Sequence, residues 1–245
     1  MNLPSVYNLI KLDKVNSTNT EAKNYAQKGE EIGPHGTLIW ALQQTQGRGR
    51  LGKHWDSPLG NLYSSLILRP DISLKNAAQI GFVAALAIYD ALGNIGPPGH
   101  QIHCKWPNDI FINKKKIAGI LIETSVSNNI VTQFIIGIGV NIKSRPNDLK
   151  YSSTSLFENE LNIKAHNLFF NIIKRLYFFI ENYKNIEFLY LSKQLSSRFF
   201  NKKSLINVYN GNNKNEGLFS EIGCLGELII KNKNKNLTIK YGEII

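Results

Sequence analysis

Hydrophobic runs of strand and helix length alternate along this chain. Apolar runs at 36–44 and 61–68 predict two buried strands, and a glycine-rich basic loop separates them. After Ser73, the expected N-cap, a nearly apolar stretch predicts a helix that packs deep in the domain and ends at Gly93. The first part of the chain therefore predicts a buried core that combines strands with a helix.

Two further segments have helical patterns. Residues 17–29 predict a short helix, with Thr18 and Glu21 spaced as a capping box and Gly29 as the stop signal. Residues 166–196 return to helical periodicity over a length that suits one long helix or two broken ones. Helices are therefore expected before, between and after the strands.

The remaining runs have the pattern of strands. In the middle of the chain they lie at 101–106, 109–112, 117–124 and 130–142, with a close turn at 113–116. From Ser204 to Ile245, four short alternating runs separated by Asn-Gly and Gly-rich spacers predict a small, mostly antiparallel β barrel or sandwich. We therefore expect two domains, at 1–199 and 200–245.

Composition agrees with a fully folded chain. Its 245 residues are 42% hydrophobic and 19% charged, unlike a disordered protein. The net charge of +11 favours anionic partners such as nucleic acid, phosphates or an acidic protein, or reflects a general preference for Lys and Asn. Cys104 and Cys224 have no metal-ligand or disulfide spacing, so we expect buried, reduced thiols. We see no signal peptide or membrane span, and expect a cytoplasmic protein.

The basic loop is the first candidate site. Gly47-Arg48-Gly49-Arg50-Leu51-Gly52-Lys53-His54-Trp55 combines three glycines with three cations and ends in an aromatic ring. Glycines allow close backbone approach, Arg binds phosphate or carboxylate with two parallel hydrogen bonds, and Trp55 could stack on a base. A flexible connector, an RNA-binding segment and another kind of nucleotide loop fit the same residues. The pattern is not a Walker A loop or a dinucleotide fingerprint.

Two more segments complete the set. In Lys105-Trp106-Pro107-Asn108-Asp109 the proline bends the chain, so that Asn108 and Asp109 either hold Mg²⁺ or substrate, or only cap a turn. Gly137-Ile138-Gly139-Val140-Asn141 places glycines inside an apolar strand, which indicates close approach of a ligand or of a neighbouring backbone.

Taken in order, GRGRLGKHW, SPLGNLYSSL, KWPND, KIAGILIE and GIGVN resemble the biotin protein ligases. The resemblance starts near Asp13, where Asn16 replaces an Asp of the family pattern, and extends to the C-terminus. Lys53 replaces an Arg that is usual in the family, which keeps the charge but loses the planar fork. The resemblance implies an α+β fold, with a class II synthetase-like (biotin/lipoate ligase) catalytic domain of mixed β-sheet and flanking helices, plus a small C-terminal SH3-like β-barrel.

The resemblance also implies a reaction and a set of site residues. ATP and biotin would give biotinyl-5′-AMP and pyrophosphate, and the biotinyl group would pass to a lysine of a biotin carboxyl carrier protein. The implied catalytic residues are Arg50, Lys116 and Asp109, and Asp109 would also hold Mg²⁺. The implied biotin-binding residues are Ser17, Thr18, Asn19, Gln44, Gly47, Arg48, Arg50, Lys116, Gly119 and Gly137. The implied ATP-binding residues are Arg48, Arg50, Lys53, Trp55, Asn108, Lys116 and Asn141.

Partners and alternatives follow from the same comparison. Some family members carry an N-terminal DNA-binding domain, for which there is no room before these motifs, so we expect a ligase without DNA binding or membrane association, possible as a homodimer. A lipoate or octanoate ligase of the same fold is the nearest alternative, but the loop and KWPND disfavour it. A basic nucleic-acid-binding protein is the alternative from another class, and it leaves KWPND and KIAGILIE unexplained.

Overall fold

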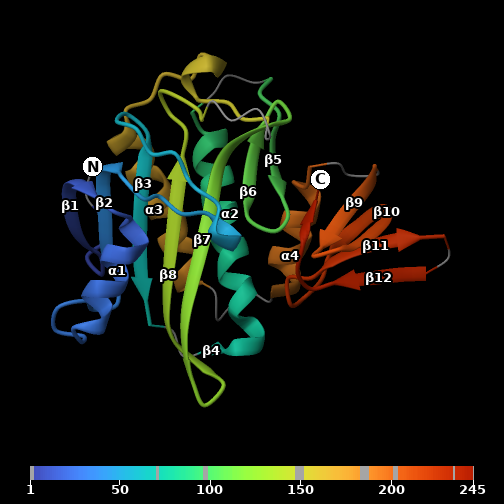
Figure 1. Cartoon of the computed structure of the whole chain (residues 1–245), viewed down its shortest axis with the longest axis horizontal. Helices are drawn as coiled ribbons and strands as arrows, with labels where there is room; N and C mark the ends of the chain where they lie inside the picture. Colours follow the sequence, from blue (N-terminus) through green and yellow to red (C-terminus); the bar gives the residue numbers. More distant parts are fainter. Residues whose placement is uncertain are drawn as a thin grey trace.

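The computed structural model describes residues 3–69, 72–95, 99–146, 152–182, 188–200, 204–233 and 235–244. They form a large sheet with flanking helices and a smaller C-terminal sheet (Figure 1). The large sheet contains β1 (Asn8–Val15), β2 (Thr37–Gln44), β3 (Leu62–Leu68), β4 (Ile72–Ser73), β5 (Ile102–Lys105), β6 (Asp109–Ile112), β7 (Lys115–Ser127) and β8 (Ile130–Val140). The helices are α1 (Thr18–Gln27), α2 (Ala77–Gly93), α3 (Ala165–Glu181) and α4 (Phe188–Ser197). The small sheet contains β9 (Leu205–Asn210), β10 (Asn213–Ile222), β11 (Leu228–Asn232), β12 (Lys235–Ile239) and β13 (Glu243–Ile244).

The large sheet is mixed, which confirms the α+β fold class. Its strand order is β1-β2-β3-β8-β7-β6-β5, with β4 on β8. β1 runs parallel to β2, whereas β2, β3, β8, β7, β6 and β5 pair antiparallel with their neighbours. β1 was not predicted, because no residue of this edge strand is fully buried and Lys11, Asp13 and Lys14 stand among its apolar residues.

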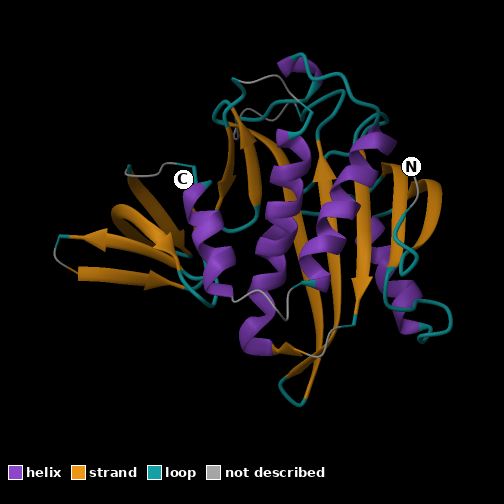
Figure 2. Ribbon diagram, turned by 180° about the vertical axis from the view of Figure 1, so that it is seen from behind, coloured by secondary structure: helices purple, strands orange, loops and turns teal. Residues whose placement is uncertain are grey.

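Alternating side chains give the sheet two packed faces. Leu38 and Trp40 of β2 belong to the main core, where Trp40 stacks on Phe169 of α3 at 5.0 Å between ring centroids. Ile39, between them, points to the other face and packs with Ala22 of α1. Figure 2 shows the first face, covered by α2 and α3. The face that carries α1 is left with room for a cavity.

Both predicted helix starts were wrong. The N-cap of α1 is Ser17, which makes no side-chain cap bond, and Thr18 is already helical. The capping box fails because the Thr18 hydroxyl contacts Gln44 and Ser65 instead. α2 starts after Asn76, because Ser73 pairs with β8 as part of the short strand β4. The predicted helix end at Gly93 is confirmed.

The later segments follow the prediction more closely. The helical pattern at 166–196 forms two helices, α3 and α4. The C-terminal runs form an antiparallel five-stranded sheet, one strand more than the runs predicted, because the run LTIKYGEI contributes to both β12 and β13. The sheet fits the expected small β domain, and a domain boundary at residue 200 stays a prediction. In the part of the chain that the structure describes, none of the helices has the length and hydropathy of a membrane span.

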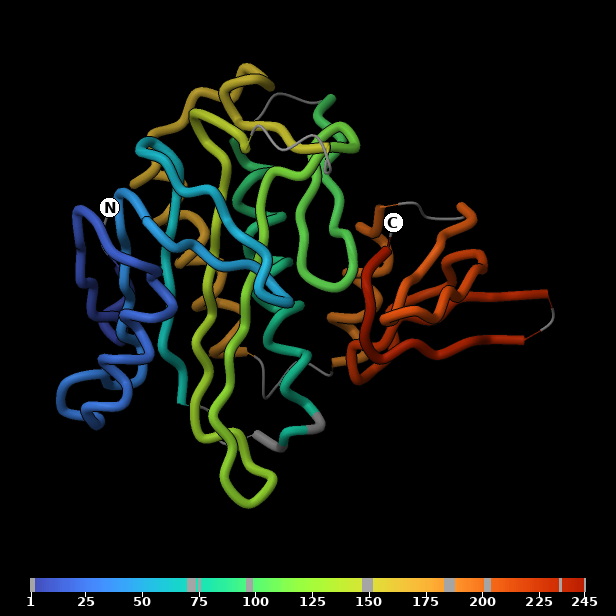
Figure 3. The backbone as a smooth tube through the Cα atoms, in the orientation of Figure 1, coloured from blue at the N-terminus to red at the C-terminus, as the bar shows by residue number. Residues whose placement is uncertain are grey.

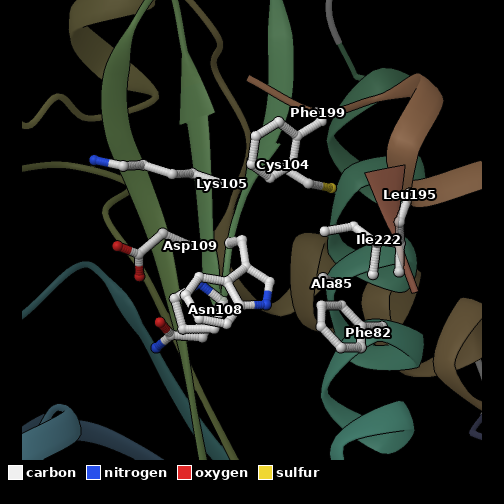
Figure 4. A pocket seen from close by; sticks show the side chains of 11 residues that line it. Phe82, Ala85, Cys104, Lys105, Asn108, Asp109, Leu195, Phe199 and Ile222 are labelled. Carbon is white, nitrogen blue, oxygen red and sulfur yellow. The ribbon is translucent and has the colours of Figure 1, made fainter. Parts of the chain in front are cut away.

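The two sides of the β5–β6 hairpin differ: one side packs against apolar side chains, and the other carries charged side chains. Figure 4 shows Phe82, Leu195 and Ile222 gathered beside Cys104, whereas the charged ends of Lys105 and Asp109 point the other way. Burial raises the pKa of the Cys104 thiol to about 12, so Cys104 is the expected buried thiol. Cys224 is exposed, and its predicted burial was wrong.

Trp106 joins the two sheets. Its side chain is buried, and its Nε1 donates a hydrogen bond of 3.0 Å to the Gly226 carbonyl oxygen beyond β10. We expect Trp106→Phe to lower the free energy of unfolding by about 1–3 kcal/mol, because the carbonyl loses a buried partner. Urea unfolding followed by circular dichroism measures this change, and a midpoint equal to that of the wild type would show that the hydrogen bond does not contribute.

Candidate active site

A cavity of about 800 Å³ lies on the face of the large sheet that carries α1. The segment between β2 and β3 crosses in front of the sheet at this place (Figure 3). The start of α1, the β5–β6 hairpin and β13 of the small sheet complete the wall. The cavity brings together these predicted residues: Ser17, Thr18, Asn19, Gln44, Arg48, Arg50, Lys53, Trp55, Asn108, Asp109, Lys116, Gly119, Gly137 and Asn141.

Gly47 is the predicted residue that does not line the cavity. A Cβ atom there would lie 2.3 Å from the Trp55 carbonyl oxygen and 2.5 Å from Ser57 Oγ. The Gly47 carbonyl oxygen accepts a hydrogen bond of 2.9 Å from the Trp55 backbone N–H. Gly47 therefore allows the two ends of the basic loop to meet.

Glycines form the floor of the cavity. A Cβ atom at Gly139 would lie 2.6 Å from the Trp55 ring, and one at Gly137 would lie 2.2 Å from Asn19 Oδ1. At Gly119 the nearest atom would be on the Trp55 ring, at 3.0 Å. The side chains of Trp55 and Asn19 thus lie in the space that was predicted for a ligand beside Gly119 and Gly137. That these two glycines bind biotin stays a prediction.

One end of the cavity is polar and uncharged. Gln44 Oε1 accepts a hydrogen bond of 2.8 Å from the Thr18 backbone N–H, and Gln44 Nε2 donates one of 2.8 Å to Ser57 Oγ. Ser57 Oγ in turn donates to the Trp55 carbonyl oxygen at 2.8 Å. These bonds connect the start of α1 to the end of the basic loop and fix the Gln44 amide.

The other end carries opposite charges close together. Lys116 Nζ lies 2.7 Å from Asp109 Oδ1 and 5.2 Å from the centroid of the Trp55 ring. Arg50 Nη1 donates to Asn108 Oδ1 at 3.3 Å. Burial lowers the pKa of the nearby Lys105 ammonium group. The negative charge of Asp109 acts in the opposite direction and raises this pKa. This end of the cavity is built to receive an anion.

Two of the loop cations meet carboxylates. Arg48 Nη2 lies 3.2 Å from Glu123 of β7, and Lys53 Nζ lies 2.6 Å from Glu243 of β13. Both pairs are partly exposed, so their contribution to stability is small. The Asn141 side chain is buried and donates to the Thr154 carbonyl oxygen at 3.1 Å.

Sequence reasoning missed several residues of this site. Lys105 and Glu243 line the cavity, and Ser65 and Glu123 bond the residues that line it. Lys105, Ser65 and Glu123 stand inside the quoted motifs KWPND, SPLGNLYSSL and KIAGILIE, so strand alternation within those motifs could have found them. Glu243 had no such signal, because its place in the cavity depends on how the two sheets pack.

The sequence profile of the biotin/lipoate A/B protein ligase family matches residues 12–141, just over half of the chain. The chain belongs to this family. The match covers the basic loop, KWPND, KIAGILIE and GIGVN, and it confirms the resemblance drawn from those motifs.

Relatives within the family agree with the profile. Over 136 residues the chain is 44% identical to the biotin–acetyl-CoA-carboxylase ligase of Paracoccus denitrificans, covering 55% of each protein. Over 153 residues it is 43% identical to the bifunctional ligase/repressor BirA of Bacillus subtilis, covering 60% of this chain and 46% of BirA. The chain thus matches about half the length of these curated relatives.

A solved structure of the family matches nearly the whole chain. The biotin protein ligase from Aquifex aeolicus in complex with biotin and ATP superposes with a TM-score of 0.82 and 28% sequence identity. The superposition covers 97% of both chains, so the small β sheet has a counterpart there as well.

Proposed function

We propose that this protein is an ATP-dependent biotin protein ligase. It joins biotin to ATP, releases pyrophosphate and transfers the biotinyl group to a lysine of a biotin carboxyl carrier protein. The observation that carries the proposal is one cavity with a neutral polar end at Thr18 and Gln44 and a cationic end at Lys116. Relatives named as biotin ligases, and a neighbour that binds biotin and ATP, support the choice of substrates.

The first step is an attack of one anion on another. A carboxylate oxygen of biotin attacks the α-phosphorus of ATP, the bond to the pyrophosphate oxygen breaks, and pyrophosphate leaves with the electron pair. Lys116 would lie between the biotin carboxylate and the α-phosphate, and Arg50 beside the phosphates would offset the remaining charge. The partial enclosure by the basic loop would protect the mixed anhydride from water.

Biotin suits the shape and polarity of the cavity. Its ureido head would meet Ser17, Thr18, Asn19 and Gln44, and its carboxylate would reach toward Lys116. Trp55, with its ring over the glycine floor, would pack against the nucleotide base.

Magnesium would enter with ATP. The described residues contain no group of three or more His, Cys, Asp and Glu side chains that could hold a metal ion by themselves. Mg²⁺ in nucleotide sites commonly uses one or two carboxylates together with phosphate oxygens, so the residues fit an ion held by Asp109 and Asn108 with the nucleotide. When bound, it would neutralise phosphate charge.

The second step needs an unprotonated carrier lysine. That amine attacks the biotinyl carbonyl, the anhydride bond breaks, and AMP leaves; Asp109 would take the proton that the amine loses. The positive net charge would favour an acidic carrier surface. Pairing of two copies and the absence of DNA binding stay predictions.

Transfer is tested with a purified biotin carboxyl carrier domain, ATP, Mg²⁺ and biotin. We expect mass spectrometry to detect one biotinyl group on the carrier, and none on a carrier whose acceptor lysine is replaced by arginine. Labelling that appears with lipoate and not with biotin would contradict the proposal.

Gly139→Ala should weaken nucleotide binding. The added methyl group would lie 2.6–2.8 Å from three atoms of the Trp55 ring, which must then move. If Trp55 packs against the base, we expect KM for ATP to rise about tenfold while KM for biotin changes little. Steady-state kinetics measures both values, and an unchanged KM for ATP would show that Trp55 does not contact the nucleotide.

A further inference from the structure

Glu123 bonds two residues of the cavity wall although it does not line the cavity. Its Oε2 accepts a hydrogen bond of 2.8 Å from Asn19 Nδ2, and its two carboxylate oxygens lie 3.2–3.3 Å from Arg48 Nη2. A carboxylate paired with an arginine can only accept, so the Asn19 amide must present its NH₂ group to Glu123. The Asn19 oxygen therefore points to Ser65, whose Oγ lies 2.6 Å away.

The same contacts continue to Gln44 through two hydroxyl groups. Ser65 Oγ lies 2.8 Å from Thr18 Oγ1, and Thr18 Oγ1 lies 3.2 Å from Gln44 Oε1. The Gln44 amide is also fixed, because the Thr18 backbone N–H can only donate and meets Gln44 Oε1 at 2.8 Å. Both ends of the chain of contacts, at Asn19 and at Gln44, are thus oxygen atoms that only accept.

This chain of contacts has one hydroxyl proton fewer than it has contacts. It contains three close oxygen–oxygen contacts, from Asn19 to Ser65, Ser65 to Thr18 and Thr18 to Gln44, but Ser65 and Thr18 supply one hydroxyl proton each. Two hydrogen bonds can form at a time. When they run toward Asn19, Gln44 Oε1 accepts only from the Thr18 backbone N–H and keeps one lone pair for a further donor. Ser65 is buried outside the cavity, whereas Thr18 and Gln44 line it, so a ligand can supply the missing proton at those two residues.

We propose that Glu123 is a positioning residue that sets ligand specificity: by fixing the direction of Asn19, it makes Thr18 and Gln44 select a ligand whose head group donates an N–H. The inference deepens the proposed function, on which it rests, since the ureido head of biotin carries N–H donors and the dithiolane of lipoate carries none. It assigns the choice between these two substrates to a carboxylate that touches neither.

Glu123→Gln is a direct test because it can reverse the chain of contacts. Next to Arg48, the glutamine would turn its oxygen to the guanidinium and its NH₂ group to Asn19. The Asn19 amide would then turn over, giving up its 3.4 Å hydrogen bond to the Leu121 carbonyl oxygen, and donate to Ser65. Ser65 would donate to Thr18, and Thr18 to Gln44. Three protons would serve three contacts. Gln44 Oε1 would then accept from both the N–H and the hydroxyl of Thr18 and would have no lone pair left for the ligand N–H.

The measurement is the dissociation constant of biotin by calorimetry, with the cyclic carbamate analogues of biotin, in which oxygen replaces one ureido N–H, as comparison ligands. We expect Glu123→Gln to weaken biotin about tenfold, the size expected for one lost hydrogen bond, and to weaken the analogue that lacks the selected N–H less than about threefold. The ratio of the dissociation constants of biotin and of that analogue should therefore change, which a general structural defect would not cause.

Two further variants complete the design. Glu216→Gln is the matched control, an exposed glutamate paired with Lys214 at 3.2 Å on the small sheet, and should bind biotin as the wild type does. Ser65→Ala removes the proton shortage by another route, because the Thr18 hydroxyl can then donate to Gln44. This variant should also show a reduced preference for biotin over the carbamate. If the wild type binds no biotin, the proposed function fails. If the wild type binds biotin, but the relative dissociation constants of Glu123→Gln for biotin and the two carbamates equal those of the wild type, the inference fails.

Discussion

Lys116→Ala should reduce adenylate formation by about 10²–10³-fold, the loss typical of removing one charge that stabilises a transition state. The Lys116 ammonium lies 2.7 Å from Asp109 Oδ1 at the cationic end of the cavity, where the two reacting anions would meet. The fold should survive, since the side chain is partly exposed and its pairing contributes little to stability. The rate is measured as biotin-dependent exchange of pyrophosphate into ATP.

Lys115→Ala is the control for this variant. Lys115 is the neighbouring residue on β7, is exposed and does not line the cavity. Its replacement removes the same charge from the protein while leaving the cavity intact, so we expect an exchange rate close to that of the wild type. Equal rates in the two variants would remove Lys116 from the mechanism.

Asp109→Asn should impair both steps, for different reasons. The amide keeps the shape of the side chain but no longer holds Lys116 by charge, so adenylate formation should fall about tenfold. The amide also cannot take a proton from the carrier lysine, so transfer from isolated biotinyl-5′-AMP should fall about 10²-fold or more. Quenched-flow measurements with the carrier domain follow the second step by itself.

The two steps can fail separately, and each outcome has a meaning. Unchanged transfer would show that Asp109 is not the base. Unchanged exchange would show that the first step needs neither the ion pair with Lys116 nor a magnesium ligand at Asp109. Asp13→Asn is the control, because Asp13 is exposed on the edge strand β1 and lies outside the cavity. It should leave both rates as in the wild type.

Much of the fold and of the site could be predicted because local sequence determines it. The apolar runs that form β2, β3 and α2 are long enough to be recognised by their pattern, and Asn210-Gly211 marks the first turn of the small sheet, with Gly211 at a φ of 56°. The ordered motifs of the basic loop, KWPND and KIAGILIE led to residues that the fold gathers around one cavity.

The rest depends on contacts between distant segments. The capping box at Thr18 looks correct in the sequence, but Gln44 and Ser65 draw the Thr18 hydroxyl away from the helix. The carboxylates that meet Arg48 and Lys53 come from β7 and β13, 75 and 190 residues later in the chain. Hydrophobic periodicity carries no information about such pairs.

Exchange of labelled pyrophosphate into ATP, with biotin or lipoate as the acid, tests the central claim most directly. The reaction needs only the protein, Mg²⁺ and the two substrates of the first step, so it does not depend on the identity of the carrier. We predict exchange that requires biotin and that lipoate does not support. Exchange with lipoate alone, or no exchange with either acid, would contradict the assignment of this cavity to biotin activation.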